Sequence, residues 1–259
     1  MYKCNEKKVI FKMLKKTWMK WLDGVYMEDY PSKKDDINQL YISDNELRVN
    51  RTIEIVKKFF EKIKIDLHSI TAANIGYSSF DQKFIDELNI HLVNIIPNKS
   101  FLPEDVILNN ESLDYFDLSS EGVMPTRTYD LLICTEVIEH LFSDDRKIFT
   151  NLANLINPNG FLVLSVPNSV SLVRRILVML GKNNIAQKKK IIKGTFGGYG
   201  HIREYASYEI EYFLNRSFKL ALKRGINDFP FTRRLPFSKF LPVSLSDDML
   251  FIAKKITLD

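Results

Sequence analysis

The stretch from residue 129 to residue 168 constrains the fold of this chain more than any other. It starts with a short, continuous apolar run at residues 131–134, typical of a strand buried on both faces of a parallel sheet. From Asp144 onward, apolar residues recur at intervals of three and four, which indicates an amphipathic helix. Turn residues at 157–160 end this helix, and a second apolar run follows at residues 161–166. The pattern predicts a βαβ unit with a right-handed crossover.

The same alternation of short apolar runs and helical patterns extends from His68 to the C-terminus. The expected strands are residues 68–75, 90–96, 113–118, 131–134, 161–166, 218–224 and 250–255. Between them we expect helices at residues 81–88 and 169–181, and another that begins at Ser207 as its N-cap. This order predicts an α/β fold with a doubly wound, mostly parallel seven-stranded sheet and one antiparallel edge strand.

The N-terminal part of the chain has helical rather than strand patterns. Residues 1–30 form an apolar stripe with lysines opposite, and residues 45–63 form a second amphipathic helix. The first helix either covers the domain that follows or lies at a membrane interface, where Trp and Lys are both favourable. We expect an N-terminal helical cap segment over residues 1–67 and a Rossmann-like domain over 68–259, with an insert at about 169–206.

Composition narrows the class of protein. The chain has 259 residues, 45% hydrophobic and 27% charged, which suits a soluble globular protein with one large α/β domain. We expect no secretory signal, because the first residues lack an apolar h-region, and no apolar run is long enough to cross a membrane. Its two cysteines, Cys4 and Cys134, make no disulfide framework, so we expect a cytoplasmic protein. Basic clusters near residues 3–20 and 174–193 are either solvated surfaces or attract anionic partners.

Two sequence motifs carry a family resemblance. Residues 129–141 read Y-D-L-L-I-C-T-E-V-I-E-H-L, and residues 157–168 read N-P-N-G-F-L-V-L-S-V-P-N. These segments resemble the class I S-adenosylmethionine-dependent methyltransferases, in particular the branch with E-H-L after the fourth strand. The G-H-x-R-x-Y step at residues 200–205 is a recurrent feature of that branch. The resemblance extends from about Ser69 to the C-terminus, and it implies S-adenosylmethionine as the cofactor.

The resemblance also implies which residues bind the cofactor, and two segments depart from the family pattern, the first of them with Asn74 where the family has an acid. The loop after the first strand keeps Gly76 but lacks the other family glycines, with Phe80 at the last of these positions. After the second strand, Asn98 is the nearest substitute for the family's ribose-binding acid. The full set of expected cofactor contacts is Asn74, Gly76, Tyr77, Ser78, Asn98, Asp117, Leu118, Thr135 and Glu136.

The residues expected to take part in catalysis lie in the E-x-x-E-H motif at residues 136–140. If this turn is helical, Glu136, Glu139 and His140 share one face. His140 is the expected general base, because imidazole titrates near neutral pH, and either Glu139 or Glu136 is expected to orient its ring. Two alternatives stay open for His140, a structural hydrogen bond and a metal ligand. We expect no bound metal, with Tyr199, His201 and Arg203 as substrate contacts and with His68 and His91 as structural residues on strands.

The resemblance implies an enzyme that O-methylates a small hydroxylated acceptor, expected here to be a sugar of bacterial surface-polysaccharide biosynthesis. An alternative is a catalytically inert methyltransferase-like binding module, since the glycine motif is altered. An NAD-linked oxidoreductase is disfavoured because the chain has no G-x-G-x-x-G motif. The expected partners are a small-molecule or sugar acceptor, no nucleic acid, at most peripheral membrane contact and a possible second copy of the chain.

Overall fold

The computed structural model describes residues 34–102, 112–181, 201–227, 232 and 238–256, with only the backbone for residues 34–44. The chain divides into two compact units, Met1–Asp44 and Asn45–Asp259, and the second contains the whole sheet. Four sequence expectations lie outside the described residues: the helix at 1–30, Cys4, Tyr199 and most of the insert, at 182–200. The predicted division at residue 68 stays a prediction.

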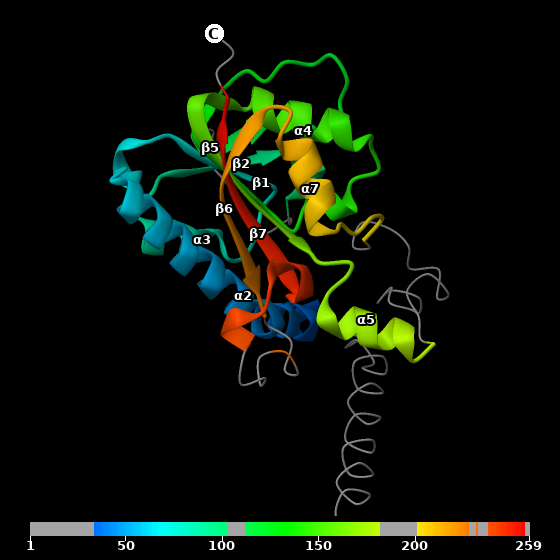
Figure 1. Ribbon diagram of the computed structural model, residues 1–259. Helices are drawn as coiled ribbons and strands as arrows, with labels where there is room; N and C mark the ends of the chain where they lie inside the picture. The colour runs from blue at the N-terminus through cyan, green and yellow to red at the C-terminus, as the bar shows by residue number, and fades with distance from the viewer. Residues whose placement is uncertain (1–33, 103–111, 182–200, 228–231, 233–237, 257–259) are drawn as a thin grey trace, which may run out of the picture. The chain divides into compact units, whose positions relative to one another are not determined.

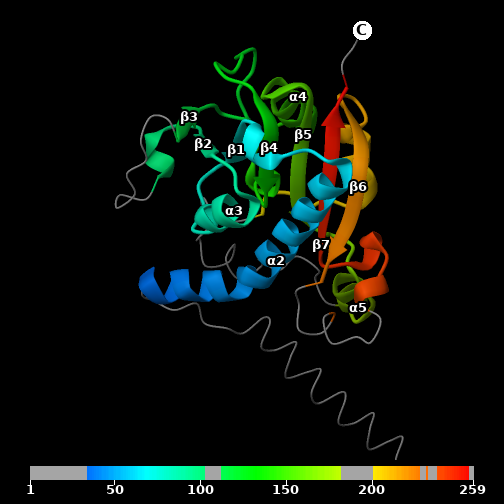
Figure 2. The same cartoon turned by 90° about the vertical axis from the view of Figure 1, so that its left-hand side faces the viewer.

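The seven-stranded sheet confirms the predicted fold class. The strands are β1 (Ala72–Ile75), β2 (Leu92–Ile96), β3 (Leu113–Tyr115), β4 (Tyr129–Thr135), β5 (Ile156–Pro167), β6 (Phe218–Ile226) and β7 (Asp248–Lys255). Figure 1 shows the sheet with its covering helices, and the order of the strands, which Figure 2 shows, is β3-β2-β1-β4-β5-β7-β6. Strands β1 to β5 are parallel, whereas β7 runs antiparallel to both of its neighbours, β5 and β6.

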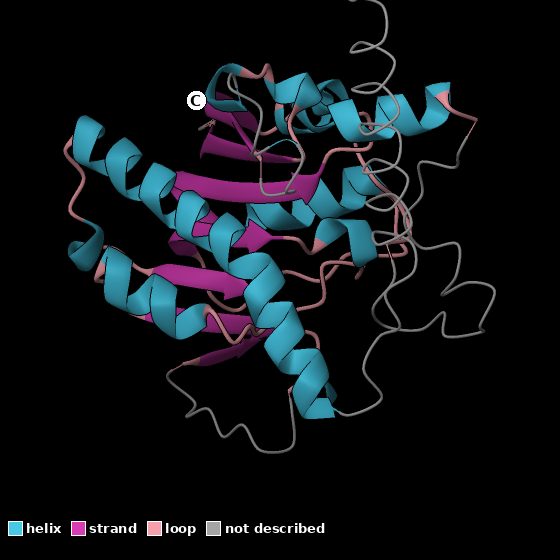
Figure 3. Cartoon of the chain, turned by 90° about the horizontal axis from the view of Figure 1, so that it is seen from below, coloured by secondary structure: helices cyan, strands magenta, loops and turns pink. Residues whose placement is uncertain are grey.

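Helices cover both faces of this sheet, as a doubly wound fold requires. The described helices are α2 (Lys34–Ile63), α3 (Asp81–Leu88), α4 (Asp145–Asn154), α5 (Leu172–Met179) and α7 (Ser207–Leu214). Residues 45–63 of α2 lie with α3 on one face, and α4 and α7 lie on the other (Figures 2 and 3). None of the helices in the described part of the chain is long and apolar enough to cross a membrane.

The two faces of β4 show why its apolar run is continuous. Leu132 and Cys134 belong to the core under α4 and α7, whereas Leu131 and Ile133 belong to the core under α2 and α3. Successive side chains of a strand point to opposite faces. A strand covered on both sides therefore favours apolar residues at successive positions, as these four residues show.

Several predicted element bounds need correction. The first strand begins at Ala72 rather than His68, because Asp66 accepts a hydrogen bond from the backbone N–H of His68 and starts a 3₁₀ turn, Leu67–Ser69. His68 and His91 are exposed and lie outside the strands. The N-cap of α7 is Ala206 rather than Ser207, since the carboxylate of Glu209 accepts a hydrogen bond from the Ala206 backbone N–H.

The predicted turn at residues 157–160 lies within β5, which begins at Ile156. A Cβ on Gly160 would meet the backbone oxygen of Asp130 at 2.9 Å and Cγ2 of Ile156 at 2.7 Å. Only glycine fits this close approach between β4 and β5. At the other end of the strand, the expected helix after residue 168 is confirmed as α5.

Candidate active site

The loop after β1 is the first part of the expected cofactor site. Gly76 has a φ of +91°, in the region that side chains disfavour, and its N–H donates to the backbone oxygen of Ile95 on β2. A Cβ on Gly76 would meet nothing within 4 Å, so the backbone angle rather than crowding selects glycine here. In register, Asn74 of β1 pairs with Ile133 of β4, which places the carboxyl ends of these two strands side by side.

A buried polar cluster lies beneath this loop. The carboxylate of Asp81, the first residue of α3, accepts hydrogen bonds from the side-chain amides of Asn74 and Asn94 and from the backbone N–H of Ser78. Burial raises the pKa of Asp81 to about 6, against the lowering effect of the Ser78 and Asn94 hydrogen bonds. The Asn74 amide, expected to contact the cofactor, therefore donates to Asp81.

Two more expected cofactor contacts lie after β2 and β3. Asn98 is exposed, and its side-chain oxygen caps the 3₁₀ turn Lys99–Phe101 by accepting from the Ser100 backbone N–H at 3.0 Å. Asp117 is also exposed, and its carboxylate accepts from the backbone N–H of Ser119 at 2.7 Å. Leu118 is buried. Both polar side chains thus shape their own loops while lying past the carboxyl ends of parallel strands.

Glu136 follows β4, where Thr135 is the last strand residue, and the structure gives its carboxylate two partners that the sequence did not reveal. One oxygen accepts from Arg48 of α2 at 2.8 Å, and the other accepts from the hydroxyl of Ser165 on β5 at 2.8 Å. The backbone of Glu136 has a φ of +57°, which is uncommon for a residue with a side chain. The left-handed turn and the two contacts fix this carboxylate at the end of the sheet.

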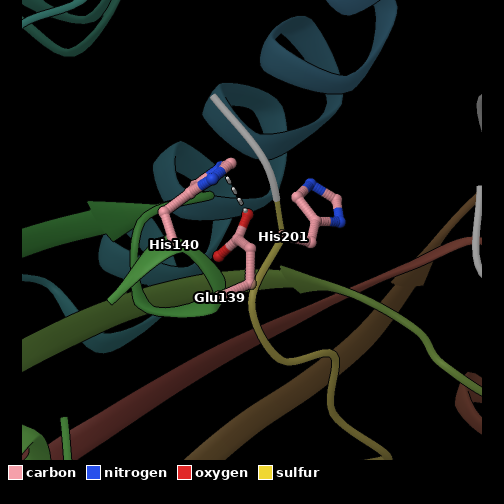
Figure 4. A group of neighbouring side chains, drawn as sticks. All are labelled: Glu139, His140 and His201. Atoms are coloured by element: carbon pink, nitrogen blue, oxygen red, sulfur yellow. Dashed lines mark ion pairs between the residues drawn. The ribbon is translucent and has the colours of Figure 1, made fainter. Parts of the chain in front are cut away.

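Glu139, His140 and His201 come together beside this turn (Figure 4). Glu139 and His140 lie in a 3₁₀ turn, Ile138–His140, rather than in the α-helix that their spacing permits. The distance from Nε2 of His140 to Oε1 of Glu139 is 3.6 Å, and the rings of His140 and His201 pack edge to face with centroids 4.9 Å apart. Two segments some sixty residues apart in sequence thus form one cluster.

The carboxylate of Glu139 is in an unusual environment. It is fully buried, and neither of its oxygens accepts a hydrogen bond from any described residue. Burial raises the pKa of Glu139 well above its ordinary value, and the negative charge of Glu136 adds to this effect. The positive charge of Arg48 opposes it. Burial and the nearby Glu136 charge therefore favour the protonated form of Glu139 more than they would for an exposed glutamate.

The segment after residue 200 is attached to this cluster by its backbone and its side chains. The carbonyl of Glu139 accepts from the backbone N–H groups of Ile202 at 2.7 Å and Arg203 at 3.2 Å. Nδ1 of His201 lies 2.9 Å from the carboxylate of Glu204, which Arg174 of α5 holds through both of its oxygens. Glu204 and Arg174 were not identified from the sequence as site residues.

The structure gives Arg203 contacts away from the two histidines. Its guanidinium donates to Asp145 and Glu209, and it lies 5.0 Å from the centroid of the Tyr205 ring. Tyr205 is buried and donates its hydroxyl to Asp145 at 2.6 Å. These contacts join the G-H-x-R-x-Y segment to α4 and α7. They explain the position of the Arg203 guanidinium without any contact to a substrate. Its expected substrate role stays a prediction.

The histidine cluster also has the composition of a metal site. One ligand atom from each of Glu139, His140 and His201 lies within 4.8 Å of the others. Carboxylate oxygen and imidazole nitrogen are common ligands of divalent transition metals. Glu136, which the E-x-x-E-H spacing had suggested as a ligand, is instead bound by Arg48 and Ser165. The expected absence of a metal stays a prediction.

Comparisons of sequence find methyltransferases. The chain is 29% identical over 132 residues to the ubiquinone biosynthesis O-methyltransferase of Rickettsia bellii, a match that covers 48% of this chain and 51% of the relative. It is 34% identical over 79 residues to the mitochondrial enzyme of the same name from Schizosaccharomyces pombe, covering 30% and 28%. The chain thus spans about half the length, or less, of these curated relatives. No family model matches the sequence.

Comparisons of structure agree on the fold. A possible histamine N-methyltransferase from Thermotoga maritima superposes with a TM-score of 0.51 at 10% identity, over 84% of this chain and 94% of that one. A putative S-adenosylmethionine-dependent methyltransferase from Listeria monocytogenes gives 0.50 at 14% identity, over 82% and 100%. Sheet order, motifs and these similarities identify the fold as that of the class I S-adenosylmethionine-dependent methyltransferases.

Proposed function

We propose that this protein is an S-adenosylmethionine-dependent methyltransferase that methylates a hydroxyl oxygen of a small acceptor. The observation that carries the proposal is the cluster of Glu139, His140 and His201 beyond the carboxyl end of β4. In open α/β sheets, ligands bind at the carboxyl ends of the strands. The curated relatives are O-methyltransferases by name, which favours oxygen as the methyl acceptor.

The cofactor is proposed to lie across the loops that follow β1, β2, β3 and β4. S-adenosylmethionine supplies an electrophilic methyl group. The chain offers the fixed backbone at Gly76 and Ser78, the exposed polar side chains of Asn98 and Asp117, and the turn at Thr135 and Glu136. Because Asn98 replaces a carboxylate, we expect weaker ribose binding than in the resembled family, by about one to two decades in affinity.

His140 is proposed to accept the acceptor's hydroxyl proton as the oxygen attacks the methyl group. The ring is about one-third exposed and lies 3.6 Å from the Glu139 carboxyl group, so it faces both the surface and a buried acid. The Glu139 carboxyl group, 3.6 Å from Nε2 of His140, is proposed to stabilise the imidazolium that forms when the proton arrives. His201, next to His140 and anchored by Glu204, is proposed to contact the acceptor.

The relatives' names bear on the acceptor. They are enzymes of ubiquinone biosynthesis, so a hydroxylated aromatic compound of the kind from which quinones form is the first acceptor that we propose. The basic cluster near residues 174–193 suggested a sugar carrying phosphate, and this remains the second. Cytoplasmic localisation, peripheral membrane contact and a homodimer stay predictions.

Two measurements test the proposal. Calorimetry with S-adenosylmethionine and S-adenosylhomocysteine should show binding, and turnover assays should then compare hydroxylated aromatics with nucleotide sugars. Methylation of a hydroxyl in either class supports the proposal and selects the acceptor. Binding without turnover on any hydroxyl, amine or carbon acceptor would favour the inert module. Absence of heat at millimolar cofactor would contradict the proposal as a whole.

A separate experiment, chelation of metals during the turnover assay, decides whether the cluster of Glu139, His140 and His201 holds a cation.

A further inference from the structure

We propose that Asp81 is a positioning residue for cofactor binding, and that with Asn74 and Asn94 it holds the loop at residues 76–80 in place of the missing glycines. This inference rests on the proposed function, since it concerns the loop assigned to S-adenosylmethionine. The three side chains come from different elements, α3, β1 and β2, and all are more than nine-tenths buried. They lie directly under the loop that departs most from the resembled family.

The hydrogen bonds of the cluster converge on one carboxylate. Oδ1 of Asp81 accepts from the Asn74 amide at 3.0 Å. Oδ2 accepts from the Asn94 amide at 2.6 Å and from the backbone N–H of Ser78 at 2.9 Å. A carboxylate is the only common side chain that accepts through both terminal atoms and donates nothing when ionised. Three donors directed at one group therefore favour the ionised form of Asp81.

The cluster holds the loop at both of its ends. Asn94 donates a further hydrogen bond, from the same amide nitrogen, to the backbone oxygen of Gly76 at 3.1 Å. At the other end, the Asp81 N–H donates to the backbone oxygen of Ser78 at 3.0 Å, while the Ser78 N–H donates back to the Asp81 carboxylate. Side chains thus fix the path of the backbone from Gly76 to the first turn of α3.

The hydrogen bonds around Asp81 explain how this loop keeps a fixed backbone although it lacks most of the glycines of the resembled family. A glycine-rich loop brings backbone N–H groups close to a nucleotide because it carries no side chains. Here only Gly76 keeps a left-handed backbone, whereas Tyr77, Ser78 and Phe80 carry side chains. Asp81 and its two asparagines supply the order that fixes the loop before the cofactor arrives. Preorganisation of this kind improves affinity by lowering the entropy lost on binding.

The test is the isosteric substitution Asp81→Asn, measured by calorimetry with S-adenosylhomocysteine. An amide at position 81 has one acceptor atom and sets a donor against the donors of Asn74, Asn94 or Ser78. We expect the dissociation constant to rise at least about tenfold. Turnover at saturating S-adenosylmethionine should stay within about twofold of wild type, because the acceptor and His140 are untouched. The matched control is Asp86→Asn, an exposed carboxylate on the same helix.

The outcomes separate this inference from the proposed function. Wild-type protein that binds the cofactor, together with Asp81→Asn protein that binds equally well, would overturn the role of Asp81 alone. A variant with equal cofactor affinity but lower turnover would also overturn it. Wild-type protein that binds no cofactor overturns both. If Asp81→Asn does not fold, Asn94→Ala decides by the same measurement, because it removes two loop-holding bonds and leaves Asp81 with two donors.

Discussion

Two buried carboxyl groups near the carboxyl ends of neighbouring strands have opposite surroundings. Asp81, beneath the loop after β1, accepts three hydrogen bonds from nearby amides. Glu139, in the turn after β4, accepts none from the described residues and faces two imidazoles. Burial raises the pKa of both groups. A buried polar group with a full set of partners rigidifies its surroundings, whereas one without them is costly and marks a place where chemistry or a ligand is expected.

The comparison therefore separates a positioning site from a reacting site. The polar groups beneath the loop after β1 form hydrogen bonds that hold the loop itself. The structure of this loop should therefore not depend on which acceptor the protein binds. The turn after β4 places a buried acid with a raised pKa next to His140. Arg48 and Ser165 hold this turn through their contacts with Glu136. Substitutions in the two regions should consequently affect different measured quantities, cofactor affinity in the first and turnover or pH dependence in the second.

The largest effect should come from His140→Ala. General-base catalysis contributes about 10²–10⁴-fold, so turnover should fall at least about a hundredfold. Cofactor affinity should stay nearly unchanged, because the ring lies beyond the expected cofactor contacts. Steady-state kinetics with calorimetry checks both quantities, and His91→Ala, an exposed histidine before β2, is the control. Full turnover in His140→Ala would show that the residue is structural and that catalysis rests on proximity.

Glu139→Gln should change how stability depends on pH. The folded-state pKa of Glu139 lies above its unfolded value. Its contribution to stability is therefore fully present below the unfolded pKa and is lost as pH rises through the folded pKa. Glutamine never ionises, so the variant should gain stability relative to wild type as pH rises, by up to about 1.4 kcal/mol per pH unit between the two pKa values.

Denaturant unfolding between pH 4 and pH 8.5 measures this difference for Glu139→Gln. The exposed Glu87, on α3, provides the matched control, and its Gln variant should follow the wild-type curve at every pH. If the Glu139→Gln curve also ran parallel to wild type, Glu139 would be ionised in the folded protein. The distinction between the two buried carboxyl groups would then disappear.

A smaller effect is expected from Arg48→Met. The Arg48 and Glu136 side chains are only 15% and 13% exposed, and the substitution leaves a largely buried carboxylate without its ionic partner. The free energy of unfolding should fall by about 1.5–3 kcal/mol, as measured in urea. Arg51→Met, which breaks a pair of 51% and 42% exposure on the same helix, should cost at most about 1 kcal/mol. Equal losses in the two variants would show that Glu136 does not depend on Arg48.

Local sequence patterns predicted most of the fold. Mostly apolar runs marked the strands of the sheet, because a strand covered on both faces favours apolar side chains and accepts polar ones, such as Asn74 and Asn94, only where they find hydrogen-bond partners. The E-x-x-E-H and G-H-x-R-x-Y motifs marked Glu139, His140 and His201. The bounds near His68 and Ser207 were wrong, since the side chains of Asp66 and Glu209 cap backbone N–H groups two and three residues away, and apolar periodicity does not register such caps. These errors lie at element ends, where a single hydrogen bond decides the boundary.

By itself, the sequence determined the order of strands and helices and the residue types available at each strand end, because periodicity and turn chemistry act over a few neighbours. Only the tertiary structure decided which of those residues have partners. Arg48 reaches Glu136 across 88 positions, and His201 reaches His140 from another segment. The Asn94 amide, on β2, donates a hydrogen bond to the carboxylate of Asp81, at the start of α3. Contacts between remote residues arise when parallel strands bring their carboxyl ends to one edge, and no local pattern encodes which side chains then meet.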